Sequence, residues 1–572
     1  MKEVLIIGSG ISGMMCAVRC AEKGMHVTLV SPFPSERSQS VMAAGGINAV
    51  RTVHEQGDSV ESHIEDTLKG GCYINGKQAV TGLCENAGEI INYLESIGTV
   101  FSIDENGQPA CRAFGGQSHK RTYYCGSSTG KQIVSALVME IRRFEALGIV
   151  TRRLGSCFHS ALIREGKCYG AVFFDEHTYS LEPVYADATV VATGGQNALF
   201  GKTTGSTQCD GYTAGKLFMQ GALLKNLEFI QYHPTTLETS QKRMLISEAA
   251  RGEGGRLFYY ELNSARDINT YDNIGEASVK AESSLSMFGS GRRIYFMEDK
   301  YGPNGNLMTR DIVSREIQAT GKEVFLDVSF LKKSLIDKRL PEIRDLCKKY
   351  RNIDITKEPI PVSPSVHFFM GGLAVHLNHE TNIQNLYAIG ECASMYHGAN
   401  RLGGNSLLAA IYSGNVAADS ISGQESTEKS PDFTTHIEEE KKELYSRLES
   451  SSPFPSMYIR DMLAETMQKK LGIVRDEKAL SEGIEDIEYD LSIVDQIKYD
   501  SSVLPYFNYS LKGLLTIARA TLTLAKERKE SRGAHYRSDY PNSDDSLAFA
   551  SLISYDNGKY KAFLDTDREF EC

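Results

Sequence analysis

The sequence predicts an α/β fold in which one parallel sheet is interrupted by an inserted segment and then followed by a helical region. Three short apolar runs that end in glycine support this prediction, at residues 4–7, 188–192 and 386–389. Each run has the length and composition of a buried strand. Because the runs are so far apart, we expect them to form one sheet that the chain leaves and re-enters.

The first run opens a strand–turn–helix–strand unit. The turn Gly8-Ser9-Gly10-Ile11-Ser12-Gly13 follows it, residues 14–23 have helical character, and residues 26–30 form a second strand-like run. In a GxGxxG turn the first glycine permits the tight turn, and the second lets the backbone approach a pyrophosphate at the helix N-terminus. The pattern therefore predicts a Rossmann-type dinucleotide site.

One part of that pattern is missing. The second strand ends in Ser31, where an NAD-binding fold usually carries an acid that contacts the ribose. The missing acid speaks against an NAD-only enzyme, and the ribose contact must be weaker or come from another segment. Glu391, just after the third apolar run, is the candidate for another contact with a flavin nucleotide.

Composition excludes several classes of function. The formal net charge of −11 argues against nucleic-acid binding, which needs a basic footprint. No run of about 18 apolar residues exists, so no transmembrane segment is expected, and the first residues lack a secretory apolar region. The 12 cysteines form no CxxC pair, which predicts reduced cytoplasmic thiols and no metal or iron–sulfur cluster in this chain.

A chain of 572 residues is too long for one core, and its pattern changes along its length. The insertion begins near Pro234 and contains a polar stretch at 261–290, and charge-rich helical periodicity follows much later. The predicted parts are a nucleotide-binding domain in two pieces (1–233 and 357–423), the insertion (234–356), a helical domain (436–529) and a C-terminal tail (530–572).

Dense motifs identify a family. The chain resembles the flavoprotein subunits of fumarate reductase and succinate dehydrogenase, a superfamily that also contains L-aspartate oxidase. The motifs that carry the resemblance are Arg37-Ser38-Gln39-Ser40, Ala192-Thr193-Gly194-Gly195, Ser247-Glu248-Ala249-Ala250-Arg251-Gly252, Arg310-Asp311-Ile312-Val313-Ser314-Arg315, and residues 228–235, 358–362, 367–372, 397–403 and 531–535.

The resemblance implies a Rossmann-type FAD-binding domain, an inserted and mobile α+β capping domain, and a helical domain after it. It also implies FAD as the cofactor and a small dicarboxylate as the substrate. The residues expected to bind FAD are Gly8, Ser9, Gly10, Ser12, Gly13, Ser31, Ser38, Gln39, Ser40, Gly45, Gly46, Ala192, Thr193, Gly194, Asp210, Glu391, Arg401, Ser406 and Leu407.

Reduction of fumarate needs a hydride at one carbon and a proton at the other, with both carboxylates held by cationic and hydrogen-bonding groups. Arg401 and His367 suit one carboxylate. His233 and Ser247 suit the other, and the resemblance assigns all four positions to substrate binding.

By the same resemblance, the proton donor is Arg310, supplied through Glu248 and Arg251. A free arginine is a poor acid, with a pKa above about 12, but it can relay a proton when a neighbouring carboxylate resupplies it. Glu248 and Arg251 have the spacing of residues that share a helix face. Their spacing alone favours a structural ion-pair network of Arg310, Glu248 and Arg251, whereas the flanking family motifs favour the proton relay.

Two positions depart from the family pattern. Gln39 stands where membrane-associated relatives have the histidine that bonds covalently to the flavin, so FAD is expected to bind noncovalently. Without that bond the reduced flavin should be the stronger reductant, which favours fumarate reduction over succinate oxidation. Ala44 stands where relatives usually have Gln or Glu, and the sequence shows no replacement for that polar contact.

The alternatives are L-aspartate oxidase and an electron-transfer subunit that docks an iron–sulfur partner. Aspartate oxidases carry a glutamate where this chain has Phe114, although the stretch Ser118-His119-Lys120-Arg121 is closer to the oxidase pattern. In each case electrons are exchanged with an outside partner, which could be an iron–sulfur subunit, a free flavin or a nicotinamide. The expected location is cytoplasmic, or peripheral on the inner face of the membrane through a partner.

Overall fold

A computed structural model describes residues 1–51, 57–240, 242–261, 291–424, 430–448, 455–497 and 505–571. The polar stretch predicted at 261–290 lies outside the described residues except for Glu261.

The main sheet has five parallel strands in the order β19-β10-β1-β2-β6. These strands are β1 (Glu3–Ile7), β2 (His26–Ser31), β6 (Val150–Leu154), β10 (Ala188–Val191) and β19 (Leu386–Ala388). The three apolar runs that the sequence analysis singled out are neighbours, with β10 between β1 and β19. The prediction of one sheet shared by distant segments is confirmed.

Glycines shape the turn between β1 and α1 (Ile11–Glu22). Gly8 has φ of +112°, and a Cβ there would lie 2.3 Å from the carbonyl oxygen of Ala192, so no other residue fits. A Cβ on Gly13 would lie 2.0 Å from the Gly8 carbonyl oxygen. Gly13 therefore lets the helix pack closely against the turn that precedes it.

Helices cover this sheet. α1 packs against α5 (Thr129–Ala146) and α14 (Asn405–Gly423), and almost all of its residues are buried. The remaining elements of this region are α2 (Val60–Gly70), α3 (Lys77–Glu85), α4 (Ala87–Ser96), α6 (Tyr212–Met219), a small sheet of β3 (Ile47–Asn48), β4 (Cys111–Arg112) and β5 (Thr122–Tyr123), and an antiparallel sheet of β7 (Ser156–Arg164), β8 (Lys167–Asp175) and β9 (Leu181–Tyr185).

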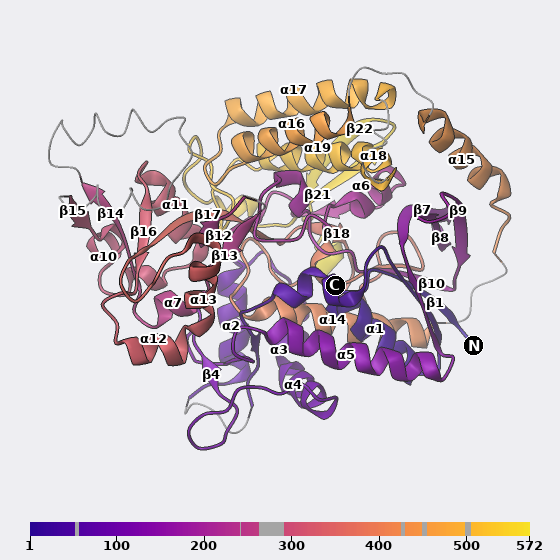
Figure 1. The fold of residues 1–572 in the computed structure, drawn as a ribbon. Coiled ribbons are helices and arrows are strands. Elements are labelled where there is room, and N and C mark those ends of the chain that lie inside the picture. Colours follow the sequence, from indigo (N-terminus) through magenta and orange to yellow (C-terminus); the bar gives the residue numbers. More distant parts are fainter. Residues whose placement is uncertain are drawn as a thin grey trace.

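The inserted segment builds a second sheet on one side of the molecule (Figure 1). Its order is β13-β12-β17-β16-β14-β15. The strands are β12 (Ile230–Glu238), β13 (Arg243–Leu245), β14 (Arg256–Glu261), β15 (Arg292–Ile294), β16 (Val324–Asp327) and β17 (Ile360–Phe369), and the helices are α7 (Ala249–Gly252), α10 (Phe296–Tyr301), α11 (Arg310–Ala319), α12 (Lys333–Arg339) and α13 (Pro341–Arg351).

This segment has a hydrophobic core of its own, which includes Leu237, Leu257, Val313, Leu326 and Ile336. Its longest strands, β12 and β17, pair with each other and continue toward the main sheet. The boundary predicted between residues 233 and 234 therefore falls inside β12, and β17 lies beyond the boundary predicted after residue 356. The strand pair joins the two parts of the chain.

A group of helices packs together in the upper part of Figure 1. It consists of α16 (Ser456–Lys470), α17 (Glu477–Ile493) and α19 (Leu511–Glu527), and α15 (Thr434–Leu448) lies to one side. The short helix α18 (Pro505–Tyr509) precedes α19. The hairpin of β21 (Ser551–Asp556) and β22 (Lys559–Leu564) extends a sheet that also contains β11 (Leu224–Lys225), β18 (Gly372–Ala374) and β20 (Ala393–Ser394). Among all the helices described, none is long and apolar enough to cross a membrane.

Candidate active site

One continuous cavity lies where β1 and β10 end and reaches the inserted segment. Every predicted FAD-binding residue except Gly13 lines it. At its other end the lining includes Phe114, His233, Ser247, Glu248, Arg310, His367 and Arg401. The carboxyl edge of a parallel sheet is the usual place for a ligand in such folds. The structure thus brings the two predicted sets of residues into one site.

The nucleotide end of the cavity fits a phosphate-bearing cofactor. Gly10 lies at the N-terminus of α1. A Cβ at this position would lie 3.3 Å from Ser40 Oγ, so the absence of a side chain leaves room for a ligand beside the helix N-terminus. Ser38 Oγ and Gln39 Oε1 are both buried without a hydrogen-bond partner in the chain. Buried polar atoms normally have partners. A bound dinucleotide would supply them.

Ser31 stands where NAD-binding folds carry a ribose-binding acid, and Glu391 is the candidate for another nucleotide contact. The two residues make different interactions. Ser31 Oγ accepts a hydrogen bond from Ser9 Oγ (2.9 Å) and donates one to the Phe33 carbonyl (2.7 Å), so it braces the glycine turn. Glu391 accepts a hydrogen bond from the Phe369 N–H (3.0 Å) through Oε1. Burial raises the pKa of Glu391 to about 7, so near neutral pH this carboxyl exchanges between protonated and ionised forms.

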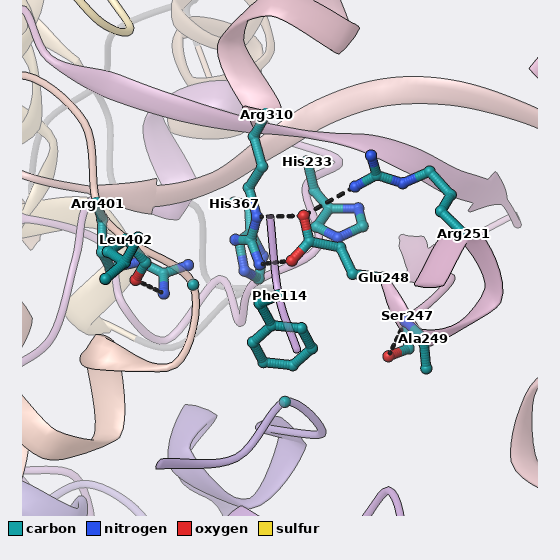
Figure 2. A network of polar contacts seen from close by, with 12 residues as sticks. Phe114, His233, Ser247, Glu248, Ala249, Arg251, Arg310, His367, Arg401 and Leu402 are labelled. Carbon is teal, nitrogen blue, oxygen red and sulfur yellow. Dashed lines mark hydrogen bonds and ion pairs between the residues drawn. The ribbon is translucent and has the colours of Figure 1, made fainter. Parts of the chain in front are cut away.

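Figure 2 shows an arginine on each side of Glu248. Arg310, the first residue of α11, donates from Nη2 to Glu248 Oε2 (2.9 Å) and from Nε to Oε1 (3.2 Å). Arg251 donates from Nη2 to Oε1 (2.8 Å) and from Nη1 to the Asn306 carbonyl (2.6 Å). The Arg310 side chain is 11% exposed and that of Arg251 is 2% exposed, so this is a buried chain of three charges.

The arginines control the charge of Glu248. Burial opposes ionisation of this carboxyl, but Arg310 and Arg251 outweigh burial and hold its pKa well below its ordinary value. Glu248 is therefore a carboxylate at neutral pH. Arg251 does not line the main cavity and faces a second hollow formed with residues such as Asn304 and Leu307.

Gln231 joins Arg310 to Arg401, and the sequence analysis did not assign it a role. Its Oε1 accepts from Arg310 Nη1 (3.0 Å) and from Arg401 Nη2 (2.9 Å). Its Nε2 donates to Asn400 Oδ1 (2.7 Å) and to the Arg401 carbonyl (2.8 Å). Gln231 precedes His233 by two positions on β12, and such residues usually share a strand face, which was the available signal.

Arg401 carries a buried charge that no carboxylate of the described residues contacts directly. Within this part of the chain its guanidinium reaches Gln231 and the Leu402 carbonyl (3.4 Å) and lies 4.5 Å from the centre of the Phe368 ring, while its Nε has no hydrogen-bond partner. Burial, reinforced by the charge of Arg310, lowers the pKa of Arg401 to about 9. A ligand carboxylate here would relieve an existing desolvation cost.

The two histidines lie on the paired strands β12 and β17, with their ring centres 5.3 Å apart. Thr204 Oγ1 and His367 Nδ1 are 2.8 Å apart, and His233 Nδ1 lies 3.1 Å from the Thr235 carbonyl. Burial, and then the charge of Arg310, lower both pKa values well below the ordinary histidine value. Both rings are therefore neutral near pH 7 and act as hydrogen-bonding groups.

Ser247 also lines the cavity, just before Glu248 and α7. Its Oγ accepts a hydrogen bond from the Ala249 N–H at 3.3 Å, as Figure 2 shows. The hydroxyl proton is therefore left to donate to a ligand.

Comparison with known proteins decides the family. A model described as "FAD binding domain" matches residues 3–407, and one described as "Fumarate reductase flavoprotein C-term" matches residues 460–567. The succinate dehydrogenase flavoprotein subunit of Bacillus subtilis (strain 168) is 35% identical over 585 residues, which cover 98% of this chain and 95% of that protein. The chain belongs to the fumarate reductase and succinate dehydrogenase flavoprotein family.

As a member of this family, the chain is an FAD-dependent oxidoreductase of the class that acts on CH–CH bonds. A solved structure of E. coli quinol fumarate reductase matches with a TM-score of 0.84 and 27% identity, covering 98% of this chain and 96% of that one. L-aspartate oxidase of Pyrococcus abyssi (strain GE5 / Orsay) is 33% identical, over 94% of this chain and 96% of that protein. The fold class predicted from the sequence is confirmed.

Phe114 bears on the choice within the flavoprotein family. It is buried and lines the cavity beside Gly403, whose Cβ would lie 3.0 Å from that of Phe114. The carboxylates in the described cavity lining are Asp210, Glu248 and Glu391, and each already accepts hydrogen bonds from the protein. Of these, Glu248 is already paired with two arginines, and Phe114 itself offers a substrate ammonium no charge.

The stretch that resembles the oxidase pattern has a structural role. Arg121 is fully buried and pairs with Asp58 (2.7 Å) and Asp66 (2.5 Å), which ties its loop to α2. His119 and Arg121 do not line the main cavity.

Proposed function

We propose that this chain interconverts fumarate and succinate, with fumarate reduction as the favoured direction. The observation that carries the proposal is the position of Arg310. Its guanidinium faces the same cavity as the nucleotide turn, and it is bonded to a carboxylate that Arg251 links to a second hollow. Such a site offers a proton supply in the same cavity as the cofactor.

Each end of the substrate has a matching set of groups. Arg401 and His367 would hold one carboxylate, and His233 with Ser247 would hold the other. Because both histidines are neutral, the positive charge opposite the dicarboxylate comes from Arg401 and Arg310. Gln231 holds these two guanidiniums through one oxygen atom and so fixes their separation.

When bound and reduced, FAD would supply the hydride that adds to one carbon of the double bond. Arg310 would give a proton to the other carbon, while the Glu248 carboxylate takes up a proton through Arg251 and passes it on to Arg310. The product then carries one added hydride and one added proton. The ionised state of Glu248 suits this role, since only a carboxylate can accept the incoming proton.

FAD attachment gives a direct test of Gln39. We propose noncovalent binding because a carboxamide cannot form the linkage that a histidine forms. Acid denaturation of the purified protein should release all of the yellow colour into the supernatant as FAD. Absorbance spectra of the supernatant and the pellet would measure this, and colour that stays on the precipitated chain would refute noncovalent attachment.

Substrate choice is tested by comparing two reactions on one preparation. The protein should reduce fumarate with an artificial electron donor and should oxidise L-aspartate poorly or not at all, because Phe114 stands in the cavity wall where aspartate oxidases carry a glutamate suited to the ammonium. Rapid oxygen-dependent turnover of L-aspartate would show that the chain is an aspartate oxidase instead.

We further propose that electrons reach FAD from a partner. The relatives named above include a "flavoprotein subunit", and an iron–sulfur subunit or another external donor would play that part here. Any attachment to a membrane would then come through the partner. Copurification with a cysteine-rich protein would support a subunit partner, and full activity of the isolated chain with a reduced nicotinamide would argue against one.

A further inference from the structure

One residue of the cavity wall comes from the helical region. Tyr506 on α18 lines the cavity together with Asp210, which precedes α6. The Tyr506 hydroxyl donates a hydrogen bond to Asp210 Oδ2, and the Tyr212 N–H donates to Oδ1 (2.9 Å). Each carboxylate oxygen of Asp210 thus accepts one hydrogen bond from the protein, with lone pairs left to accept from a ligand.

The position of Tyr506 is itself fixed. Arg460 on α16 donates to the Phe507 carbonyl from Nη2 (2.7 Å) and Nε (3.1 Å), and from Nη2 to Ser510 Oγ (2.6 Å). The Tyr506 ring packs at 5.7 Å from the Tyr212 ring. α18 is therefore braced by α16 on one side and by α6 on the other.

The carboxyl group of Asp210 needs this support. Burial raises its pKa, and the hydrogen bond from Tyr506 partly counters that effect by stabilising the ionised form. An ionised Asp210 is an acceptor for hydroxyl or N–H groups, which a dinucleotide carries in its ribose, ribityl and ring parts. Losing the Tyr506 hydroxyl would leave Asp210 with one hydrogen bond fewer in a buried site.

We propose that Tyr506 is a positioning residue for the cofactor: from the helical region it fixes Asp210 in the wall of the FAD cavity and so slows the release of FAD. The proposal rests on noncovalent FAD. It assigns the helical region a part in cofactor retention, in addition to its packing role.

The test compares two tyrosines on one helix. Tyr506→Phe removes a hydroxyl that binds Asp210, whereas Tyr509→Phe removes a buried hydroxyl that has no hydrogen-bond partner among the described residues. The rate of FAD release from the full-length holoprotein, followed by flavin fluorescence, should rise about 10-fold in Tyr506→Phe, as expected for the loss of a hydrogen bond to a charged group. It should stay within about two-fold of the original protein in Tyr509→Phe.

A double-mutant cycle tells whether Tyr506 slows FAD release by positioning Asp210 or only by stabilising the packing of α18. Asp210→Asn should speed release by itself, and Tyr506→Phe should add little to it, because both changes break one contact. Fully additive effects, or equal release rates in the two tyrosine variants, would overturn the proposal. Should Tyr506→Phe fail to fold, Arg460→Lys, which loses the forked contact to Phe507, must raise the release rate or the proposal falls. Colour retained on the acid-precipitated chain would refute noncovalent attachment and the proposed retention together.

Discussion

Replacing Arg310 with alanine is expected to lower fumarate turnover by about 10²- to 10⁴-fold, the range for losing a general acid. FAD should stay bound, because Arg310 belongs to α11 in the inserted segment and the glycine turn does not depend on it. Glu248 would keep its pair with Arg251, and Gln231 would keep Arg401. Steady-state kinetics, together with the visible absorbance of bound FAD, would measure both parts of this expectation.

Two further variants sharpen the result. Arg310→Lys should recover part of the activity if proton donation is the role, and little if a forked contact is the role, since an ammonium cannot reproduce the guanidinium fork. Arg315→Ala is the matched control, because Arg315 lies on the same helix, is paired with Asp311 at 3.9 Å and does not line the cavity. Near-normal turnover in Arg310→Ala would mean that another group supplies the proton.

Arg401→Ala is expected to damage binding as well as rate. Arg401 is a buried cation that none of the described carboxylates contacts directly, so a substrate carboxylate would gain a charge-assisted contact there. A hydrogen bond to a charged group contributes about 1.5–3 kcal/mol, so losing a forked pair should lower kcat/KM by about 10²-fold or more, with a clear rise in KM.

Arg401→Lys keeps the positive charge but removes the paired N–H donors of the guanidinium, so it separates the two contributions to substrate binding. It should restore part of the affinity but less than the original level, because one ammonium cannot span two oxygens and also reach Gln231. An unchanged KM in Arg401→Ala would show that the substrate carboxylate binds elsewhere in the cavity. The Arg310 and Arg401 series thus separate proton delivery from anion binding.

Local chemistry explains what could be predicted from the sequence. The glycine turn depends on backbone conformations that only glycine adopts, so its residues and the strands beside it are visible in the chain itself. The spacing of Glu248 and Arg251 predicted their contact, because residues three apart lie close together on one helical turn. Gly13 was grouped with the cofactor contacts, but it faces the turn and supports packing instead.

Contacts between distant segments could not be predicted in the same way. Gln231 lies within a family motif, but its bridge between Arg310 and Arg401 exists only after strands and helices from three parts of the chain meet. Tyr506 is 296 residues from Asp210, and a tyrosine in a charge-rich helical region carries no local sign of a cofactor role. The boundary predicted between residues 233 and 234 falls inside β12 for a related reason, because β12 is completed by pairing with β17, which lies far along the chain.

The order of strands along the chain has a consequence for biosynthesis. β19 pairs with β10 in the parallel sheet, yet it is translated after the whole inserted segment. The hydrophobic core of that segment ends at Val362, so a ribosome completes it before β19 has been made. Domains generally fold as units as they emerge. The residues of this core are therefore all translated before the nucleotide sheet is complete, and a complete cofactor site can form only in the last third of synthesis.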